Sequence, residues 1–213
     1  MIRVILLSVI AVLASTSLQA QQLKISTFTG LERAQIVYEN FDEPDKFKNS
    51  YGTANVSLIT TGFLIGIENR FTDFITVYYS SFSNREFDPR HFDDDSFIGD
   101  FIVDNGHSFG VGIENKIHTF LKSKNGSRLF LNASGSIGVV TMRGMYRYEA
   151  GLNEGRTLRE NRFEFSSNAS LDAEINLGNA KLAVGYSPIG FRMGYLRNSI
   201  TYNGVNVSLF FGK

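Results

Sequence analysis

Apolar and polar residues alternate along most of the chain after residue 20. In the clearest segment, 163–175, Phe163 and Phe165 alternate with Glu164 and Ser166. Successive side chains of a β-strand point to opposite faces, so each such segment predicts a strand with one apolar and one polar face. Eight strands are predicted in this way, at residues 23–30 (with an extension to 38 as an alternative), 51–71, 74–82, 108–118, 129–139, 163–175, 181–187 and 205–211.

The connections between these segments alternate in length. Short turns follow the second, fourth and sixth segments, and the turn after the fourth contains Asn125-Gly126, a dipeptide preferred in tight hairpins. Longer connections follow the first, third, fifth and seventh. We therefore predict an all-β fold, an eight-stranded antiparallel up-and-down transmembrane β-barrel, because such barrels combine an even strand number with short turns at one end. A ten-stranded barrel is the alternative if residues 96–103 pair with residues 35–38.

A soluble, lipocalin-like barrel would show the same alternation with its apolar face turned inward. The polar faces of this chain are rich in Gly, Ser, Asn and Ala, which suit a narrow interior. Its apolar faces carry almost no charge, as contact with lipid requires. These two features favour the membrane barrel, and the soluble ligand-binding barrel remains the alternative.

Aromatic residues gather near the predicted strand ends, as they do in the interfacial girdles of membrane barrels. At the external end we expect a girdle of Tyr78, Tyr79, Phe82, Tyr146, Tyr148, Phe163, Tyr195 and Tyr202. At the periplasmic end we expect Phe71, Phe74, Phe120 and Phe130.

Residues 1–20 have the features of a cleavable secretory signal. Arg3 precedes an apolar run at residues 4–13, and a polar stretch then ends at Ala20. The run is shorter than the roughly 18 residues that a spanning helix needs. We therefore expect export through the secretory pathway, removal of residues 1–20, and one barrel domain at residues 21–213.

Composition restricts the partners and cofactors. The 21 basic and 21 acidic residues give a net charge of zero, which does not favour binding to nucleic acid. The chain has no cysteine, so disulfides and cysteine-based zinc sites are excluded. It also has no metal-spaced histidine cluster and no glycine-rich phosphate loop, and we expect neither a cofactor nor a metal.

The final segment, Val205-Asn206-Val207-Ser208-Leu209-Phe210-Phe211, is amphipathic and ends in aromatic residues. In this segment and in its overall pattern, the chain resembles the small outer-membrane β-barrel proteins of Gram-negative bacteria, of the OmpX/OmpA type or the porin-like families. The resemblance implies a location in the outer membrane and contact with membrane lipid and lipopolysaccharide. It also implies insertion by the barrel assembly machinery, which recognises such a segment. We expect a monomer.

A repeated Gly-Ile-Glu-Asn motif places charges on the polar face. Glu68 and Arg70 lie two residues apart, as do Glu114 and Lys116, so each pair shares one side of its strand. We predict a charge network in the lumen, formed by Glu68, Arg70, Glu114, Lys116, Asp172, Glu174 and Lys181. Such a network is expected to act as a polar plug, and a gate or proton path is the alternative. Replacing Glu68 or Glu114 by alanine is expected to destabilise the barrel.

Arginines gather in two of the predicted external connections. They are Arg147, Arg156, Arg159 and Arg162 around the fifth connection, and Arg192 and Arg197 in the seventh. Because guanidinium groups suit phosphate and carboxylate, we expect these arginines to contact lipopolysaccharide or to pair with the acidic loop at residues 84–105. The Asp93-Asp94-Asp95 run lacks the ligand spacing of a calcium loop and is interpreted as solvated.

A catalytic site is not indicated. His107 and Ser108 are adjacent on one predicted strand, so their side chains point to opposite faces and cannot form a nucleophile–base pair. We therefore expect a structural or surface-interaction role without enzymatic activity. A narrow channel for small solutes and a lipid A deacylase or acyltransferase are the alternatives.

Overall fold

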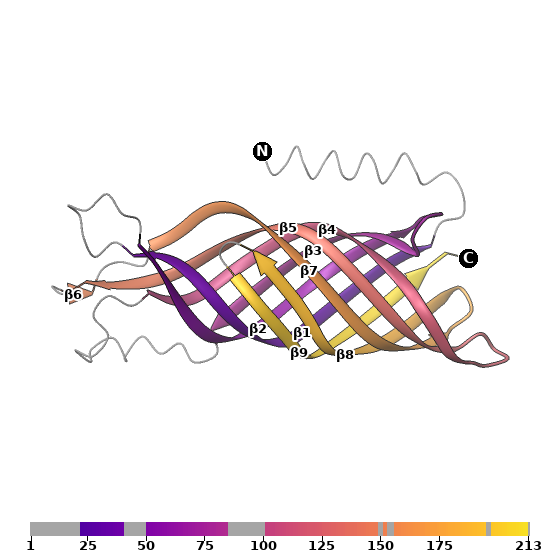
Figure 1. Cartoon of the computed structure of the whole chain (residues 1–213). Coiled ribbons are helices and arrows are strands. Elements are labelled where there is room, and N and C mark those ends of the chain that lie inside the picture. Colours follow the sequence, from indigo (N-terminus) through magenta and orange to yellow (C-terminus); the bar gives the residue numbers. More distant parts are fainter. Residues whose placement is uncertain are drawn as a thin grey trace.

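The chain forms a closed antiparallel β-barrel in a computed structural model that describes residues 22–40, 50–84, 101–148, 151–152, 156–194 and 197–212 (Figure 1). The strands are β1 (Leu23–Asn40), β2 (Ser50–Glu68), β3 (Phe74–Asn84), β4 (Phe101–Lys122), β5 (Arg128–Tyr148), β6 (Gly151–Leu152), β7 (Arg156–Asn176), β8 (Ala180–Gly194) and β9 (Arg197–Phe211). Strand β6 is a two-residue extension that pairs only with the end of β5. The other eight form the wall, so the predicted fold class is confirmed. None of the described residues forms a helix that is long and apolar enough to cross a membrane.

The barrel closes where its first and last strands pair. Strand β1 pairs with β9, with Leu23 opposite Phe211, and β4 pairs with β5. The ten-stranded alternative is contradicted, because residues 101–103 belong to β4, where Phe101 lies opposite Tyr146, while Gln35 lies opposite Asn198 of β9. Residues 96–100 lie outside the described part of the chain.

Several strands are longer at one end than predicted. Residues 101–105, 145–148 and 156–161, expected in loops, are strand residues. Strand β8 continues beyond Pro188, where the register passes from the pair Ser187–Gly204 to the pair Ile189–Tyr202. Proline has no N–H to donate, so a position skipped by the ladder tolerates it. As a result, only residues 195 and 196 separate β8 from β9, and the long seventh connection was wrongly predicted.

The two ends of the barrel differ. Residues 69–73, 123–127 and 177–179 connect strands at one end, which we call the turn end, and β1 begins and β9 finishes there (Figure 1). The opposite end, which we call the loop end, contains the connections at 41–49, 85–100, 149–155 and 195–196. Strand β2 finishes at Glu68, three residues earlier than predicted.

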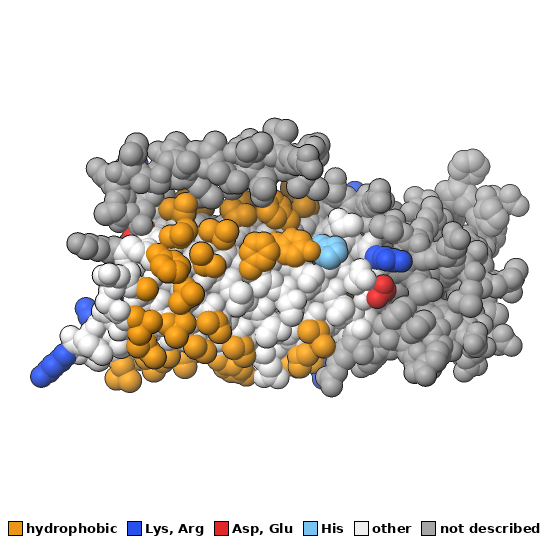
Figure 2. Space-filling view, turned by 180° about the vertical axis from the view of Figure 1, so that it is seen from behind, with side chains coloured by type: hydrophobic (Ala, Val, Ile, Leu, Met, Phe, Trp, Pro, Cys, Tyr) orange, Lys and Arg blue, Asp and Glu red, His pale blue; other side chains and the backbone are white. Residues whose placement is uncertain are grey.

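The outer wall of the barrel is apolar and the interior is largely polar. Exposed side chains on the wall include Ile25, Ile65, Ile113, Ile137 and Val207, and Figure 2 shows the hydrophobic side chains gathered over one face. The buried polar side chains include Ser26, Thr76, Ser108, Asn132, Ser170 and Ser208. This arrangement is the reverse of a soluble barrel with an apolar interior, and that alternative is contradicted.

Several aromatic residues expected in the girdles lie inside the barrel instead. Tyr78 and Phe82 are buried, and so are Phe74 and Phe130. Residues 74, 78 and 82 share one face of β3, whereas Tyr79 points outward, as the alternation of a strand requires. Glycines on neighbouring strands make room for the rings: a Cβ atom on Gly138 would lie 2.4 Å from Tyr78 Oη.

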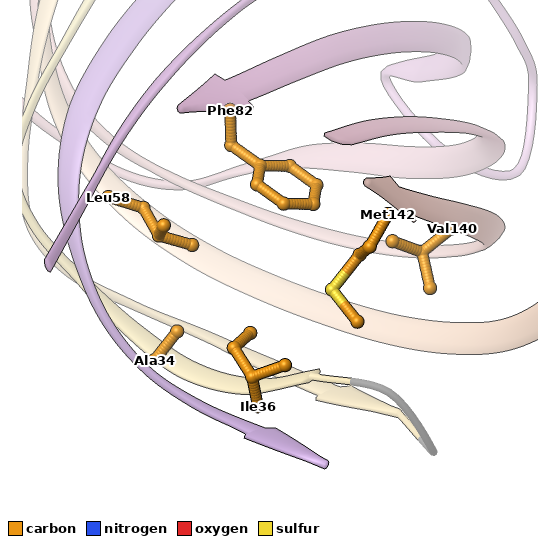
Figure 3. Close-up of a cluster of buried hydrophobic side chains, with 6 residues drawn as sticks. All are labelled: Ala34, Ile36, Leu58, Phe82, Val140 and Met142. Atoms are coloured by element: carbon orange, nitrogen blue, oxygen red, sulfur yellow. The ribbon is translucent and has the colours of Figure 1, made fainter. Parts of the chain in front are cut away.

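Two apolar clusters lie inside the barrel, one near each end. Near the loop end, six side chains pack together from β1, β2, β3 and β5 (Figure 3): Ala34, Ile36, Leu58, Phe82, Val140 and Met142. Near the turn end, Phe74 packs with Phe210 and Ala183, and the two rings lie 5.6 Å apart between centroids. The polar interior therefore lies between two apolar layers.

Candidate functional site

Four buried charged side chains meet in the barrel towards the loop end. We call Glu32, Glu164, Arg192 and Arg197 the loop-end cluster. The exposed fraction of Arg192 is 8%, and none of the other three exceeds 1%. With two acids and two bases the cluster has no net charge. It lies next to the apolar layer of Figure 3, because Ala34 and Ile36 follow Glu32 on the inward face of β1.

Glu164 is the centre of this cluster. Arg192 Nη1 lies 2.9 Å from Glu164 Oε1, and Arg197 Nη2 lies 3.1 Å from Glu164 Oε2. Ser108 Oγ donates a hydrogen bond of 2.7 Å to Glu164 Oε1. One carboxylate thus receives bonds from β4, β8 and β9, which ties distant parts of the wall together across the interior.

Glu32 completes the cluster from β1. Its carboxylate oxygens lie 3.6 Å from Arg192 Nη2 and 3.5 Å from Arg197 Nη1. Ser199 Oγ donates to Glu32 Oε2 at 3.1 Å, and the Arg197 guanidinium lies 3.9 Å from the centre of the Phe82 ring. Each buried charge therefore has at least two partners, as burial of charge requires.

The positions of two arginines in the loop-end cluster contradict our expectation. Arg192 and Arg197 were predicted in an external connection, in contact with lipopolysaccharide or the acidic loop, but they lie inside the barrel. The reason is the extension of β8 and β9, which places Arg192 on the inward face with Gly190, and Arg197 on the inward face with Ser199. Of the other arginines in that prediction, Arg162 is exposed on β7, and the side chains of Arg147, Arg156 and Arg159 lie outside the described part.

A second group of charges, the turn-end cluster, lies at the opposite end of the interior. It contains Lys24, Glu114, Lys116, Arg128 and Glu174. Lys24 Nζ bonds to Glu114 Oε1, which also accepts a 2.9 Å hydrogen bond from Asn132 Nδ2. Glu174 pairs with Arg128 at 2.6 Å and with Lys116 at 3.5 Å.

Aromatic rings border the turn-end cluster. The Lys24 ammonium lies 5.8 Å from the centre of the Phe74 ring and 5.5 Å from that of Phe210. The Lys116 ammonium lies 5.0 Å from the centre of the Phe130 ring. These are cation–π distances, so the rings stabilise the ammonium groups while they narrow the lumen.

The predicted lumen network is only partly brought together. Glu114, Lys116, Asp172 and Glu174 lie on the inward face; Asp172 is buried and accepts a 3.4 Å hydrogen bond from Asn206. Lys181 is half-buried on β8. Glu114 and Lys116 take partners from other strands instead of pairing with each other.

The first copy of the repeated motif does not enter the lumen network. Glu68 is exposed at the last position of β2, where its carboxylate accepts a 3.0 Å hydrogen bond from the backbone N–H of Gln22. Arg70 lies in the following turn, with its guanidinium 4.4 Å from the centre of the Phe71 ring. The strand ends before Arg70, so the alternation that placed both residues on one face does not apply.

A cavity of about 160 Å³ lies among the inward-facing side chains that separate the two clusters. Its lining is mostly neutral and polar, and includes Ser26, Thr76, Ser134, Ser136, Ser166, Asn168 and Ser170. Tyr78 Oη and Asn132 Oδ1 are buried at this cavity without a hydrogen-bond partner in the described part of the chain. The volume corresponds to roughly five water molecules, which would supply such partners.

The candidate nucleophile and base are separated, as the alternation predicted. Tyr79 Oη lies 2.7 Å from His107 Nδ1, and the imidazole is exposed on the outer wall. Ser108 is buried inside and bonds to Glu164. Among the described residues, no group of three or more His, Cys, Asp or Glu side chains could hold a metal ion.

Comparison with known proteins leaves the family of the chain open. The chain matches no protein-family model and none of the curated proteins. Among solved structures, it is similar to Neisserial surface protein A, with a TM-score of 0.44 and 10% identity over 92% of this chain and 98% of that one. It is also similar to the outer membrane protease OmpT from Escherichia coli, with a TM-score of 0.31 and 12% identity over 91% of this chain and 96% of that one. Likenesses this low identify no activity.

Proposed function

We propose that the chain is an integral β-barrel protein of the bacterial outer membrane, with a lumen closed to solutes and a structural or surface-interaction role. The apolar outer wall supports the membrane location, because exposed side chains such as Phe63, Phe165 and Leu209 would be costly to leave in water. The turn end would face the periplasm and the loop end the exterior, as short and long connections do in such barrels.

The observation that carries the closed lumen is the loop-end cluster. Its four side chains are buried and bonded across the interior, and apolar side chains cover them towards the loop end. A solute crossing at this level would have to separate buried ion pairs. Separating them would leave buried charges without partners, so the closed state is favoured.

The turn-end layer supports the same proposal. Phe74, Phe130 and Phe210 are each no more than 2% exposed, and the Lys24–Glu114 pair lies against two of these rings. Solutes would therefore meet a barrier at each end of the polar cavity. The polar cavity between these barriers favours the alternative of a narrow channel.

Planar-bilayer recording distinguishes these two functions. We expect the purified, folded barrel to produce no discrete conductance steps above the bilayer background, because both charged clusters stay paired. The heat-denatured chain in the same detergent serves as the control for leakage. Reproducible steps from the folded protein alone would replace the closed barrel with a channel.

The geometry gives less support to a lipid A-modifying enzyme. Ser108 is buried and hydrogen-bonded to Glu164, and His107 faces the opposite side of the wall. Membrane lipid and lipopolysaccharide would be partners of such a barrel, together with the barrel assembly machinery during insertion. The barrel would be a monomer, which the continuous closed sheet would allow.

A further inference from the structure

A groove crosses the outer wall where the short β8–β9 hairpin meets the longer strands β1 and β2. Figure 1 shows these four strands side by side on the near face of the barrel. The groove has a volume of about 510 Å³ and lies near the loop end, because its lining comes from the ends of β8 and β9 that adjoin residues 195–196. The exposed side chains that line the groove belong to neither charged cluster.

The lining of the groove has an apolar part and a polar part. Phe191, Met193 and Ile200 form the apolar part, with exposed fractions of 48%, 63% and 46%. They continue the apolar outer wall, to which Ile189 and Val205 of the same two strands also belong. These three side chains therefore form the loop-end edge of the apolar surface that would contact lipid.

The polar part lies beside these residues, mainly on the neighbouring strands β1 and β2, where Arg33 is opposite Ile200. Its exposed or half-buried residues are Arg33 and Gln35 on β1, Asn55 and Ser57 on β2, and Asn198 on β9, and the buried residues Arg192 and Ser199 also line the groove. None of the described residues that line the groove is acidic, and Arg33 is the exposed cation among them. The groove thus combines an apolar floor with a positively charged polar rim.

Two contacts hold the rim in place. The Arg33 guanidinium lies 5.6 Å from the centre of the Tyr202 ring, a cation–π distance that limits the motion of a long side chain. Asn198 Oδ1 accepts a 3.1 Å hydrogen bond from Gly194 N, which orients the amide of Asn198. A ligand binding at a rim ordered in this way loses less conformational entropy.

We propose that this groove binds the phosphorylated lipid of the outer leaflet, the lipid A part of lipopolysaccharide. Its acyl chains would lie on Phe191, Met193 and Ile200, and a phosphate would accept hydrogen bonds from Arg33, with Asn198 and Asn55 as further donors. Arginine suits phosphate because its planar fork offers two parallel N–H donors. The change from apolar to cationic lining across one groove matches an amphiphile at the membrane boundary, whereas a soluble peptide would have to enter lipid to reach the floor. The inference rests on the membrane location proposed above.

The test uses the folded full barrel in detergent micelles, titrated with two lipids that differ only in their phosphates. The probes are diphosphorylated lipid A and the same lipid after removal of both phosphates, and bound lipid is counted by native mass spectrometry. We expect the wild type to prefer the phosphorylated form. Arg33→Gln is expected to weaken its binding at least about threefold, as loss of an exposed charge-assisted contact should, and to abolish the preference.

Matched variants separate the two parts of the groove from the rest of the wall. Phe191→Ser is expected to weaken binding of both lipids, because the acyl contact does not depend on phosphate. Arg143→Gln on β5 and Phe120→Ser on β4 remove an exposed arginine and an exposed phenylalanine away from the groove, and both should bind as the wild type does.

Equal binding of the two lipids by the wild type would overturn the inference, and so would an Arg143→Gln effect as large as that of Arg33→Gln. Each variant is first shown to be folded by its faster migration in unheated gels. If the barrel folds but shows no lipid preference, only the lipid site in the groove is rejected. Conductance, or failure to enter bilayers, would reject the proposed function.

Discussion

Replacing Glu164 by alanine is expected to lower the free energy of unfolding of the barrel in detergent by about 3–5 kcal/mol, the cost of removing one partner of a buried ion pair. Glu164 is fully buried and bonds to Arg192, Arg197 and Ser108. Without it, two buried guanidinium groups share Glu32, from which each is at least 3.5 Å away. Urea titration followed by heat-modifiable gel mobility measures the change.

Two further variants identify the cause of this loss. Glu164→Gln keeps the side-chain volume and an oxygen that can accept from Ser108. The loss of unfolding free energy that this variant still shows therefore measures the contribution of the carboxylate charge. In the double variant Glu164→Ala/Arg197→Met, one of the two uncompensated cations is absent, and the loss should be smaller than the sum of the single effects. Additivity of the two changes to within about 0.5 kcal/mol would contradict a coupled cluster.

Replacing Glu114 by alanine is expected to cost about as much, again about 3–5 kcal/mol. The change leaves the Lys24 ammonium buried among aromatic rings, with the Asn132 amide also deprived of its acceptor. Adding Lys24→Met to this variant should recover part of the stability, because an apolar side chain needs no partner in that position.

The control for Glu114→Ala is the equivalent change in the other copy of the repeated motif. Glu68 is exposed and accepts one backbone hydrogen bond, so Glu68→Ala should cost about 1 kcal/mol or less. The sequence motif alone predicts equal effects for the two residues. Equal losses of stability would therefore contradict the placement of Glu114 inside and Glu68 at the rim.

The alternation of the sequence predicted which face a residue occupies better than it predicted the partner of that residue. Glu114, Asp172 and Glu174 lie inside as expected. The partner of Glu114 comes from a distant strand, Lys24 on β1, because in a narrow barrel the opposite wall is close. Glu174, by contrast, pairs with Arg128, which lies directly opposite it on the neighbouring strand β5. Pairing across a barrel depends on strand register, which local sequence does not contain.

The loop-end cluster was missed for a related reason. Glu32 and Glu164 belong to polar faces that the alternation identifies, so the sequence held a signal for them. Arg192 and Arg197 follow Pro188 in a region predicted as a connection. Only the pairing of β8 with β7 and β9 carries the strands past the proline and turns both arginines inward.

The girdles were predicted from the nearness of aromatic residues to strand ends, but the alternation along the strand determines whether a ring lies inside or outside the barrel. Tyr78 and Tyr79 are adjacent, so both could not belong to one girdle, and Tyr78 is the residue that is buried. Phe74 and Phe82 share its face of β3. Closing the lumen with aromatic rings also explains the glycines at positions 106, 110 and 138, where a Cβ atom would lie within 2.6 Å of a ring or hydroxyl atom.

Quenching of single introduced tryptophans by brominated lipid tests most directly whether the apolar wall faces lipid. The chain contains no tryptophan, so Phe165→Trp on the outer wall and Phe130→Trp inside the barrel each introduce one reporter. In vesicles of phosphatidylcholine with brominated acyl chains, we predict strong quenching of the tryptophan at position 165 and little at position 130. Equal quenching of both, or stronger quenching at position 130, would contradict a barrel that turns its apolar wall to the membrane and closes its lumen with aromatic and charged side chains.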